Sequence, residues 1–384
     1  MMAGHTSHAS RTLAVFAGLL SIVASVEFPA PTGSYNTSLS IRQVTDYSRL
    51  DPFAPDVQPR TLMVSIFQPT SQKSCKPTTV SYMDEKTAAF EDTAYGAYGI
   101  PNGTFEQLSL QVCEPPKNVH QRENTEYPVL LFSGALATSR LFYNAIAQQV
   151  SSSGYIVVTI DHPYDSDIVV FPDGSRVLAS DIDTDEQIEL AVDTRAKDVS
   201  FVLNQFANST FTKSIIPGVS CGLDIRKAGV FGHSLGGAAI AASMVNDSRL
   251  AGGINLDGTF FGPVIHSGLS KPFLIFGHEG KDTTTDPSWA AIWPKLTGWK
   301  RELMLNESQH YTFSDLPDIV SVLGIVDALP AEIDAVLGTL DGPRALKIVT
   351  DYVTLFFDMV LKGKKSKTLN GATSAYPEVS FGSP

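Results

Sequence analysis

The sequence is poor in residues that several classes of protein require. Only three of its 384 residues are cysteine, and it contains no H-E-x-x-H, no paired C-x-x-C and no calcium-loop signature, so we expect neither a metal nor another cofactor. Lysine and arginine number 28 against 40 acidic residues, for a formal net charge of -12. This shortage of basic residues argues against a nucleic-acid partner, because binding to phosphate backbones needs clustered Lys and Arg.

Long hydrophobic runs are also missing, except near the N-terminus. The run from Thr12 to Val26 is apolar, follows Arg11 and ends in small residues suited to cleavage, so residues 1–25 are predicted to be a signal peptide. A membrane anchor is the alternative, but the run is shorter than the roughly 20 residues of a spanning helix. We therefore expect a secreted, extracellular protein. Five N-x-S/T sequons agree with secretion and glycosylation: Asn36, Asn102, Asn208, Asn246 and Asn306.

The three cysteines are Cys75, Cys113 and Cys221. In an oxidising compartment, Cys75 and Cys113 could form a disulfide in the N-terminal part of the domain, which would leave Cys221 over. The alternative is that all three are buried thiols, which are common in protein cores. Connectivity does not follow from one sequence, so both interpretations stay open.

Residues 26–384 are expected to form a single domain, because a composition of 43% hydrophobic and 18% charged residues supports a sizeable core. Residues 27–60 are rich in Pro, Ser, Thr and Asp, and we expect an irregular N-terminal arm there. Residues 70–125 hold many turn formers and are expected to be an elaboration of the domain. An apolar segment at 316–340, interrupted by proline and glycine, is expected to be an insertion.

The remaining sequence alternates short apolar runs with amphipathic segments. This alternation predicts the α/β class, with a mostly parallel central sheet flanked by helices and ligand sites beyond the carboxyl ends of the strands. Strands are expected at 61–68, 127–133, 155–161, 227–232, 252–256, 272–276 and 302–305, and helices at 140–152, 185–207, 235–244 and 344–362.

One strand-to-helix junction carries the motif G-x-S-x-G, with Ser234 between Gly232 and Gly236. This context is typical of the nucleophile elbow of an α/β-hydrolase fold, a tight turn in which side chains at the glycine positions would collide with their neighbours. The turn exposes the serine hydroxyl and aims the amide N–H of Leu235 at an oxyanion. The alternative is an ordinary glycine-rich turn.

A serine hydroxyl is a weak nucleophile and needs a base that a third group orients. In this fold the chain order is serine, acid, histidine, and only His266, His278 and His310 follow Ser234. His310 lies a few residues beyond the strand at 302–305, where the base is expected, whereas His278 lies directly at the end of the preceding strand. We therefore predict His310 as the base. For His233, inside the elbow, packing or hydrogen bonding is expected.

The acid is less sharply indicated by the pattern. Asp257 ends the strand after the nucleophile helix, whereas Asp282 lies beyond the next strand, the commoner place for the acid in this fold. Glu279 is a third option. Any of these carboxylates could instead cap a helix or lie on the surface, so the pattern alone leaves the acid open.

Several segments together resemble the platelet-activating-factor acetylhydrolase family of extracellular lipases. They are GHSLGGAA around Ser234, the strand end Ile254–Asp257, the segment Gln309–Asp315 and the stretch Leu130–Ser166. The resemblance covers most of the chain from about Ser48 to the final helix. It implies a triad of Ser234, Asp257 and His310, and a second oxyanion amide at Leu136. One departure is that family members commonly carry a His-Gly pair where this chain has Gly134-Ala135.

The predicted function is therefore that of a secreted serine carboxylic-ester hydrolase, similar to the acetylhydrolases, that cleaves short or oxidised acyl esters of lipids. One alternative keeps the triad for a polyester, as in cutinases, or for a small natural-product ester. A second is a binding protein on a hydrolase scaffold, although that class usually lacks a triad member. Residues 316–340 would form short helices over the acyl pocket and contact lipid surfaces; otherwise they pack as core beside the last helix.

Overall fold

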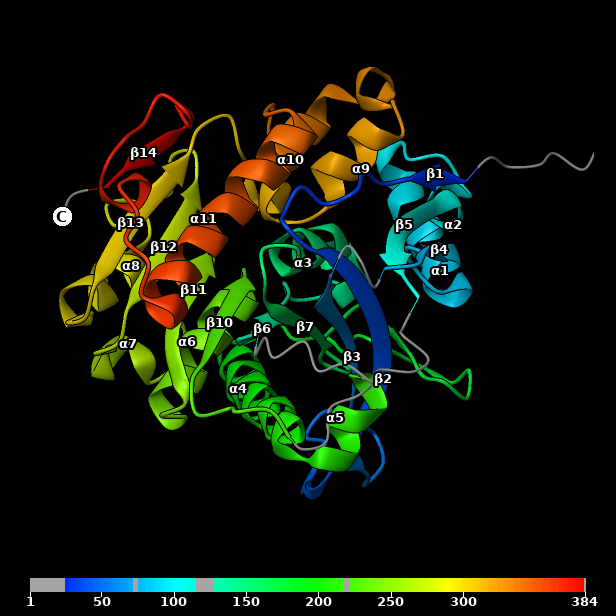
Figure 1. The fold of residues 1–384 in the computed structure, drawn as a ribbon, viewed down its shortest axis with the longest axis horizontal. Coiled ribbons are helices and arrows are strands. Elements are labelled where there is room, and N and C mark those ends of the chain that lie inside the picture. The colour runs from blue at the N-terminus through cyan, green and yellow to red at the C-terminus, as the bar shows by residue number, and fades with distance from the viewer. Residues whose placement is uncertain (1–24, 72–74, 115–126, 217–221, 383–384) are drawn as a thin grey trace, which may run out of the picture.

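The computed structural model describes residues 25–71, 75–114, 127–216 and 222–382 of the chain (Figure 1). Residues 1–24 of the predicted signal peptide and Cys221 lie outside this part. Within the described ranges, no helix combines the length and the apolar character that crossing a bilayer would require.

A nine-stranded sheet forms the centre of the molecule, in the order β14-β13-β12-β11-β10-β6-β7-β3-β2. The strands from β13 to β7 are parallel to their neighbours, whereas β14, β3 and β2 pair antiparallel at the two edges. The bounds are β2 Asn36–Leu50, β3 Pro59–Thr70, β6 Val129–Ser133, β7 Ile156–Asp161, β10 Ala228–His233, β11 Leu250–Leu256, β12 Phe273–His278, β13 Lys300–Leu305 and β14 Val379–Phe381. The mostly parallel sheet that the sequence predicts is thus confirmed.

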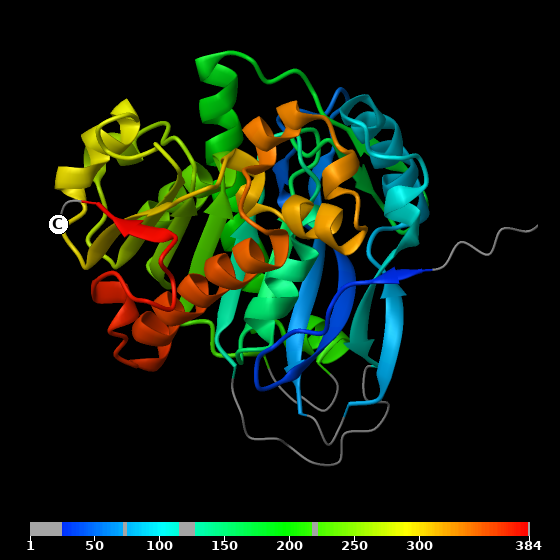
Figure 2. The same cartoon turned by 90° about the horizontal axis from the view of Figure 1, so that it is seen from above.

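Helices cover both faces of this sheet (Figure 2). Alternate residues of β6 show the two-sided burial, since Leu130 and Phe132 belong to one hydrophobic cluster and Val129 and Leu131 to the other. The first cluster includes α3 (Asn144–Ser151) and α11 (Gly342–Lys362), and the second includes α4 (Asp185–Ala207), α6 (Leu235–Asn246) and α8 (Pro287–Ile292). Burial on both faces explains why the central strands are continuous apolar runs in the sequence.

The expectation of an irregular arm at residues 27–60 is wrong. Fifteen residues of this segment, Asn36–Leu50, form the regular strand β2, which pairs with β3 along its length. The sequence hides the strand because an edge strand is only half buried. Its outward side exposes Ile41 and Tyr47, while small polar residues such as Ser38 and Ser40 lie buried on its inner side.

The predicted elaboration, of which the structure describes residues 70–71 and 75–114, is joined by β1 from outside this range in a separate three-stranded sheet, in the order β1-β5-β4. Its elements are β1 Val26–Glu27, β4 Pro77–Ser81, α1 Glu85–Tyr95, α2 Thr104–Gln107 and β5 Leu108–Cys113. The Cys75–Cys113 disulfide considered from the sequence is present and closes a separation of 38 residues. The other elements are β8 Ile168–Val170, β9 Arg176–Leu178, α5 Ser209–Ile215 and α7 Val264–Ser267.

The segment 316–340 forms short helices, which include α9 (Leu316–Val322) and α10 (Asp334–Leu337). Leu316 and Ile319 are buried in the same cluster as α11, so the beginning of this segment is core beside the closing helix. Val326, in contrast, is 54% exposed. The start of the segment is therefore core, as one of the two interpretations has it, and its middle lies at the surface. That the segment covers an acyl pocket stays a prediction.

Removing the disulfide should destabilise the protein. A Cys75→Ser/Cys113→Ser double variant frees a 38-residue loop, and the entropy that the unfolded chain regains should lower the free energy of unfolding by about 2–4 kcal/mol. Urea unfolding, followed by intrinsic fluorescence, measures this difference. An unchanged free energy of unfolding would show that the elaboration does not depend on the bond.

Candidate active site

Ser234 lies in the tight turn between β10 and α6, at the carboxyl edge of the sheet. Its φ of 57° is in the left-handed region, which a non-glycine residue rarely adopts. Its amide N–H donates to the Leu256 carbonyl at 2.9 Å, which ties the turn to β11. A Cβ at Gly232 would overlap the Gly236 carbonyl, and a Cβ at Gly236 would overlap the Ser133 carbonyl. The glycines of the motif are therefore required by close backbone approach, as the sequence predicts.

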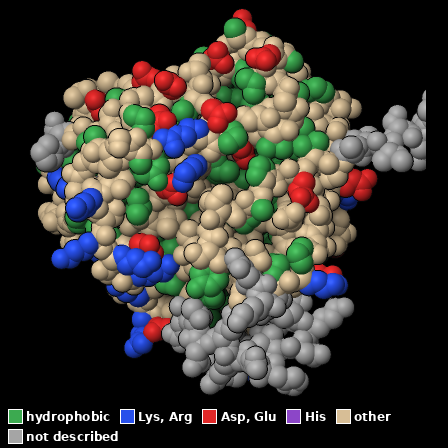
Figure 3. Space-filling view, turned by 45° about the horizontal axis from the view of Figure 1, so that its top comes forward, with side chains coloured by type: hydrophobic (Ala, Val, Ile, Leu, Met, Phe, Trp, Pro, Cys, Tyr) green, Lys and Arg blue, Asp and Glu red, His purple; other side chains and the backbone are tan. Residues whose placement is uncertain are grey.

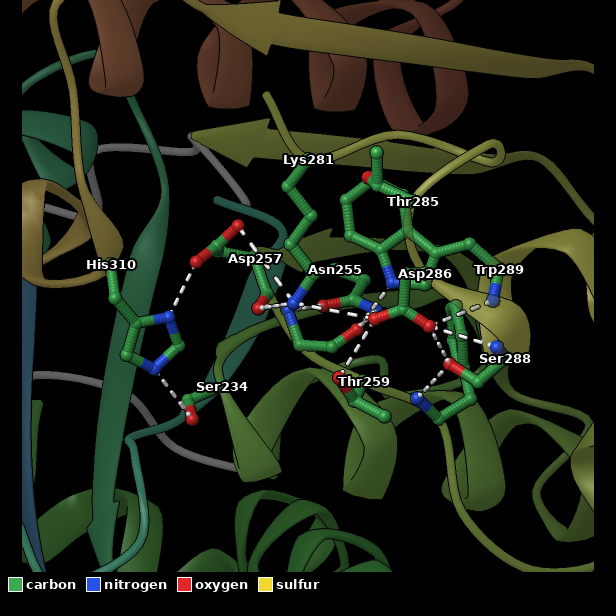
Figure 4. Close-up of polar contacts among 12 residues, drawn as sticks. Ser234, Asn255, Asp257, Thr259, Lys281, Thr285, Asp286, Ser288, Trp289 and His310 are labelled. Carbon is green, nitrogen blue, oxygen red and sulfur yellow. Dashed lines mark hydrogen bonds and ion pairs between the residues drawn. The ribbon is translucent and has the colours of Figure 1, made fainter. Parts of the chain in front are cut away.

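His310 connects Ser234 to Asp257 (Figure 4). The Ser234 hydroxyl is 2.9 Å from Nε2 of His310, and Nδ1 of the same ring is hydrogen-bonded to the Asp257 carboxylate. Asp257 follows β11 directly, and His310 begins a short 3-10 helix after β13. Three residues that the sequence predicts as a triad, from three different loops, are thus within hydrogen-bond reach of one another.

The Asp257 carboxylate is fully buried but has several donors around it. Two of these donors belong to His278: its backbone N–H, at 3.0 Å, and its ring Nδ1, at 2.8 Å. The ammonium of Lys281 donates to the Asp257 carbonyl at 2.7 Å. Burial raises the pKa of Asp257, but the hydrogen bonds from His278 and His310 and the charge of Lys281 outweigh this effect, so its pKa lies well below the usual value. Asp257 is therefore ionised at neutral pH.

The alternative acids have other partners. Asp282 accepts hydrogen bonds from the backbone N–H groups and hydroxyls of Thr284 and Thr285, and Glu279 accepts one from the backbone N–H of Glu307. His278, the alternative base, contacts the acid instead of the nucleophile. The geometry thus brings together the three residues that the resemblance implies. Sequence reasoning missed Lys281. The only signal for it was its position shortly after the end of β12.

The loop that carries His310 is anchored by Asp315, which lies five residues further along the chain. Its carboxylate accepts hydrogen bonds from the N–H groups of Ala145 and Ile146 at 2.7 and 3.1 Å, in the first turn of α3. The hydroxyl of Tyr82 donates to the same carboxylate at 2.7 Å. The base is therefore held in place from both ends of its loop, by Asp257 on one side and Asp315 on the other.

Leu235, which follows Ser234, and Leu136, which packs in the same apolar cluster as Leu235, both have unpaired amide groups. Leu235 is the first residue of α6, where an N–H has no partner inside its own helix. Leu136 lies in the loop after β6. Within the described part of the chain, neither N–H has a hydrogen-bond acceptor. Both are therefore free to donate to an oxyanion that forms on a substrate.

An apolar cluster surrounds these two residues. Leu136 and Leu235 pack with Ile182, Val192 and other residues, of which Phe53, Ile188 and Phe261 are only partly buried. The side chain of His310 is 37% exposed, so a ligand can reach the triad from solvent. The site thus joins a polar triad to an apolar wall, as an ester with a hydrophobic acyl or alcohol group would require.

Asp257, His278 and His310 are also the residues that could hold a metal. One ligand atom from each lies within 4.8 Å of the others, and nitrogen with oxygen donors suit Zn²⁺. The hydrogen bonds between these groups already use the same atoms. A metal would therefore have to displace the bond that orients His310.

Comparison with known proteins identifies the family of the chain. Residues 60–206 match the family model of platelet-activating factor acetylhydrolase, isoform II. A probable 1-alkyl-2-acetylglycerophosphocholine esterase of Arthroderma benhamiae is 34% identical over 383 residues, which cover 94% of this chain and 95% of that protein. The platelet-activating factor acetylhydrolase of Cavia porcellus is 24% identical over 62% of this chain and 61% of its own.

A solved structure extends the likeness to the fold as a whole. The ferulic acid esterase from Streptomyces cinnamoneus superposes with a TM-score of 0.77 at 31% sequence identity, over 93% of this chain and 99% of that one. The α/β-hydrolase architecture predicted from the sequence is thereby confirmed. With a relative that matches nearly its full length, this chain is a carboxylic-ester hydrolase and belongs to the platelet-activating factor acetylhydrolase, isoform II, family.

Proposed function

We propose that Ser234, Asp257 and His310 are the catalytic triad of this esterase. His310 takes the hydroxyl proton of Ser234 on Nε2 as the oxygen attacks the ester carbonyl, and the amides of Leu136 and Leu235 stabilise the oxyanion. His310 then gives this proton to the departing alcohol, and the acyl group remains on Ser234. In the second half of the reaction, His310 takes a proton from water, which attacks the acyl-enzyme, and returns it to Ser234 as the acid leaves. The observation that carries the proposal is the unbroken hydrogen-bond chain from Ser234 through His310 to an ionised Asp257.

For the substrate, we propose short or oxidised acyl esters of lipids. The support is the relative named a 1-alkyl-2-acetylglycerophosphocholine esterase, together with the apolar wall around the two oxyanion amides. The second candidate is a small aromatic ester of natural-product type. It is favoured by the likeness to a ferulic acid esterase and by the partly exposed rings of Phe53 and Phe261 in the same wall.

We further propose that the surface around Val326 contacts lipid. Val326 and Tyr98 are large apolar side chains that are 54% and 52% exposed. The segments that carry these two side chains are adjacent. Gly99, next to Tyr98, lies so close to Leu329 and Pro330, shortly after Val326, that a Cβ on it would contact both. In Figure 3, hydrophobic side chains lie among acidic ones toward the top of the drawn face, while basic ones gather toward the lower left. Exposed apolar groups of this kind suit peripheral contact with a lipid surface.

Secretion into the extracellular space is the proposed localisation. The Cys75–Cys113 disulfide suits an oxidising compartment. Asn102, Asn208 and Asn246 are exposed, so an oligosaccharyltransferase could modify them.

The triad proposal is tested with a matched pair of acid variants. Asp257→Asn should lower kcat for p-nitrophenyl acetate by about 10³- to 10⁴-fold, because the amide no longer orients and stabilises the imidazolium. Asp282→Asn makes the same chemical change at a carboxylate that accepts hydrogen bonds from Thr284 and Thr285, and should leave kcat within about twofold. Ser234→Ala is measured in parallel. Equal activity of Ser234→Ala and the wild type would refute the triad.

The substrate proposal is tested with a panel of esters that differ in acyl length and alcohol. Esters with acetyl to butyryl chains, including an acetylated ether phospholipid, should have the highest kcat/KM, and palmitoyl esters should fall by at least about 100-fold, since each misplaced methylene costs of order 1–3 kcal/mol. Methyl ferulate is the discriminating member of the panel. If its kcat/KM exceeds that of the acetylated phospholipid, the second candidate replaces the first.

The localisation proposal predicts a cleaved and glycosylated product. When the full chain is expressed in a eukaryotic secretory host, the protein in the medium should begin near residue 26, because the preceding run is removed. Treatment with peptide N-glycosidase should increase its electrophoretic mobility. A protein that stays inside the cells with an intact N-terminus would contradict the proposal.

A further inference from the structure

The peptide bond between Ala135 and Leu136 is held by a buried side chain of α4, Arg195. The Ala135 carbonyl accepts a hydrogen bond from Nη2 of Arg195 at 3.1 Å. Because a trans peptide is planar, its C=O and N–H point in opposite directions. The contact with Arg195 therefore fixes the plane of this peptide and directs the Leu136 N–H away from the guanidinium.

Arg195 can hold this peptide because it is itself fixed. Its side chain is 1% exposed and is paired with the carboxylate of Asp165, and it also donates to the Gly134 carbonyl. The Asp165 carbonyl accepts a hydrogen bond from the Ala137 N–H at 2.9 Å. Both sides of the oxyanion loop are thus attached to the same buried ion pair.

Tyr143 holds the preceding amide. The Ala135 N–H donates to the Tyr143 hydroxyl at 3.0 Å, and this hydroxyl is 2.9 Å from Nδ1 of His233. Since its oxygen accepts from Ala135, the hydroxyl proton is available for His233. A side chain at position 134 would prevent this arrangement, because a Cβ on Gly134 would lie 2.7 Å from the Tyr143 ring.

His233 continues the chain to the base. Its Nε2 is 2.9 Å from the carbonyl of His310. Burial, with a further contribution from His310, lowers the pKa of His233 well below its usual value, so the ring is neutral. With Nδ1 accepting from Tyr143, the ring proton is on Nε2 and is donated to His310. One hydrogen-bonded chain therefore runs from the oxyanion loop to the backbone of the base and passes beside Ser234.

We propose that Tyr143 is a positioning residue for the reaction: through Ala135 and His233 it keeps the oxyanion loop and the base at a fixed distance from Ser234. This inference rests on the proposed roles of Leu136 and His310. The contacts of Arg195 and Tyr143 supply the physical means of holding the loop at Gly134-Ala135.

The test is a Tyr143→Phe variant, which removes one oxygen and keeps the ring. The control is Tyr155→Phe, which also removes a hydroxyl from a buried tyrosine. The Tyr155 hydroxyl donates to Asp358 of α11 at 2.7 Å, outside the site. Kinetics with p-nitrophenyl acetate are measured with thermal unfolding of each variant. An aryl trifluoromethyl ketone, whose adduct with Ser234 carries an oxyanion, reports on the oxyanion amides directly.

Tyr143→Phe should lower kcat by about 10- to 100-fold with little change in KM, less than the loss of a whole oxyanion donor. The inhibition constant of the ketone should rise by the same factor as kcat/KM falls, because both depend on stabilising a tetrahedral oxyanion. Tyr155→Phe should keep both values within about twofold of the wild type.

A kcat of Tyr143→Phe equal to that of Tyr155→Phe would overturn the inference, and so would a rise in KM with kcat unchanged. If Tyr143→Phe does not fold, His233→Phe replaces it, because phenylalanine keeps a ring but has neither the acceptor for the Tyr143 hydroxyl nor the donor for the His310 carbonyl. The same kinetic pattern is expected. An inactive Ser234→Ala together with a normal Tyr143→Phe would refute this inference alone, whereas an active Ser234→Ala would refute the proposed function.

Discussion

The buried charge of Asp257 is the constraint around which the active edge of the sheet is organised. A carboxylate without partners at this depth would cost several kcal/mol, so the surrounding loops must supply donors. β12 provides His278 and its backbone N–H, and the loop after β13 provides His310. The loop after β12 provides Lys281, whose ammonium lies 4.0 Å from the carboxylate and donates to the Asp257 carbonyl. Each donor fixes the position of its own loop. The interaction that keeps the acid ionised is thus also the one that sets the location of the base.

The backbone around this charge is strained, and hydrogen bonds to neighbouring strands of the sheet hold it in that conformation. Ser234 and Asp257 both have positive φ values, of 57° and 59°, and conformations of this kind cost of order 1–3 kcal/mol each. Adjacent parallel strands hold the two residues, since the Ser234 N–H bonds to the end of β11 and the Asp257 N–H bonds to the Phe276 carbonyl at 2.8 Å. Two well-packed hydrophobic clusters stabilise those strands, so the strain remains local to the site.

Local signals made much of this architecture predictable from the sequence. Helix α4 begins with a capping box at Thr184, and its predicted bounds agree with the structure. The elbow was visible because its glycines and strand context are contiguous. By contrast, β2 was missed because an edge strand lacks a continuous apolar run. The choice of Asp257 over Asp282 needed the family resemblance, because it depends on how β11 and β12 sit beside the base. Arg195 and Tyr143 act through contacts distant in sequence, and no pattern marks them.

The chain from Ala135 through Tyr143 and His233 to His310 consists of neutral groups only. It therefore carries no net charge that dissolved salt could screen, unlike the ion pairs elsewhere in the protein. Such a chain holds two loops in position and does not conduct protons. Salt should therefore affect this link between the oxyanion loop and the base less than it affects the ion pairs at the protein surface.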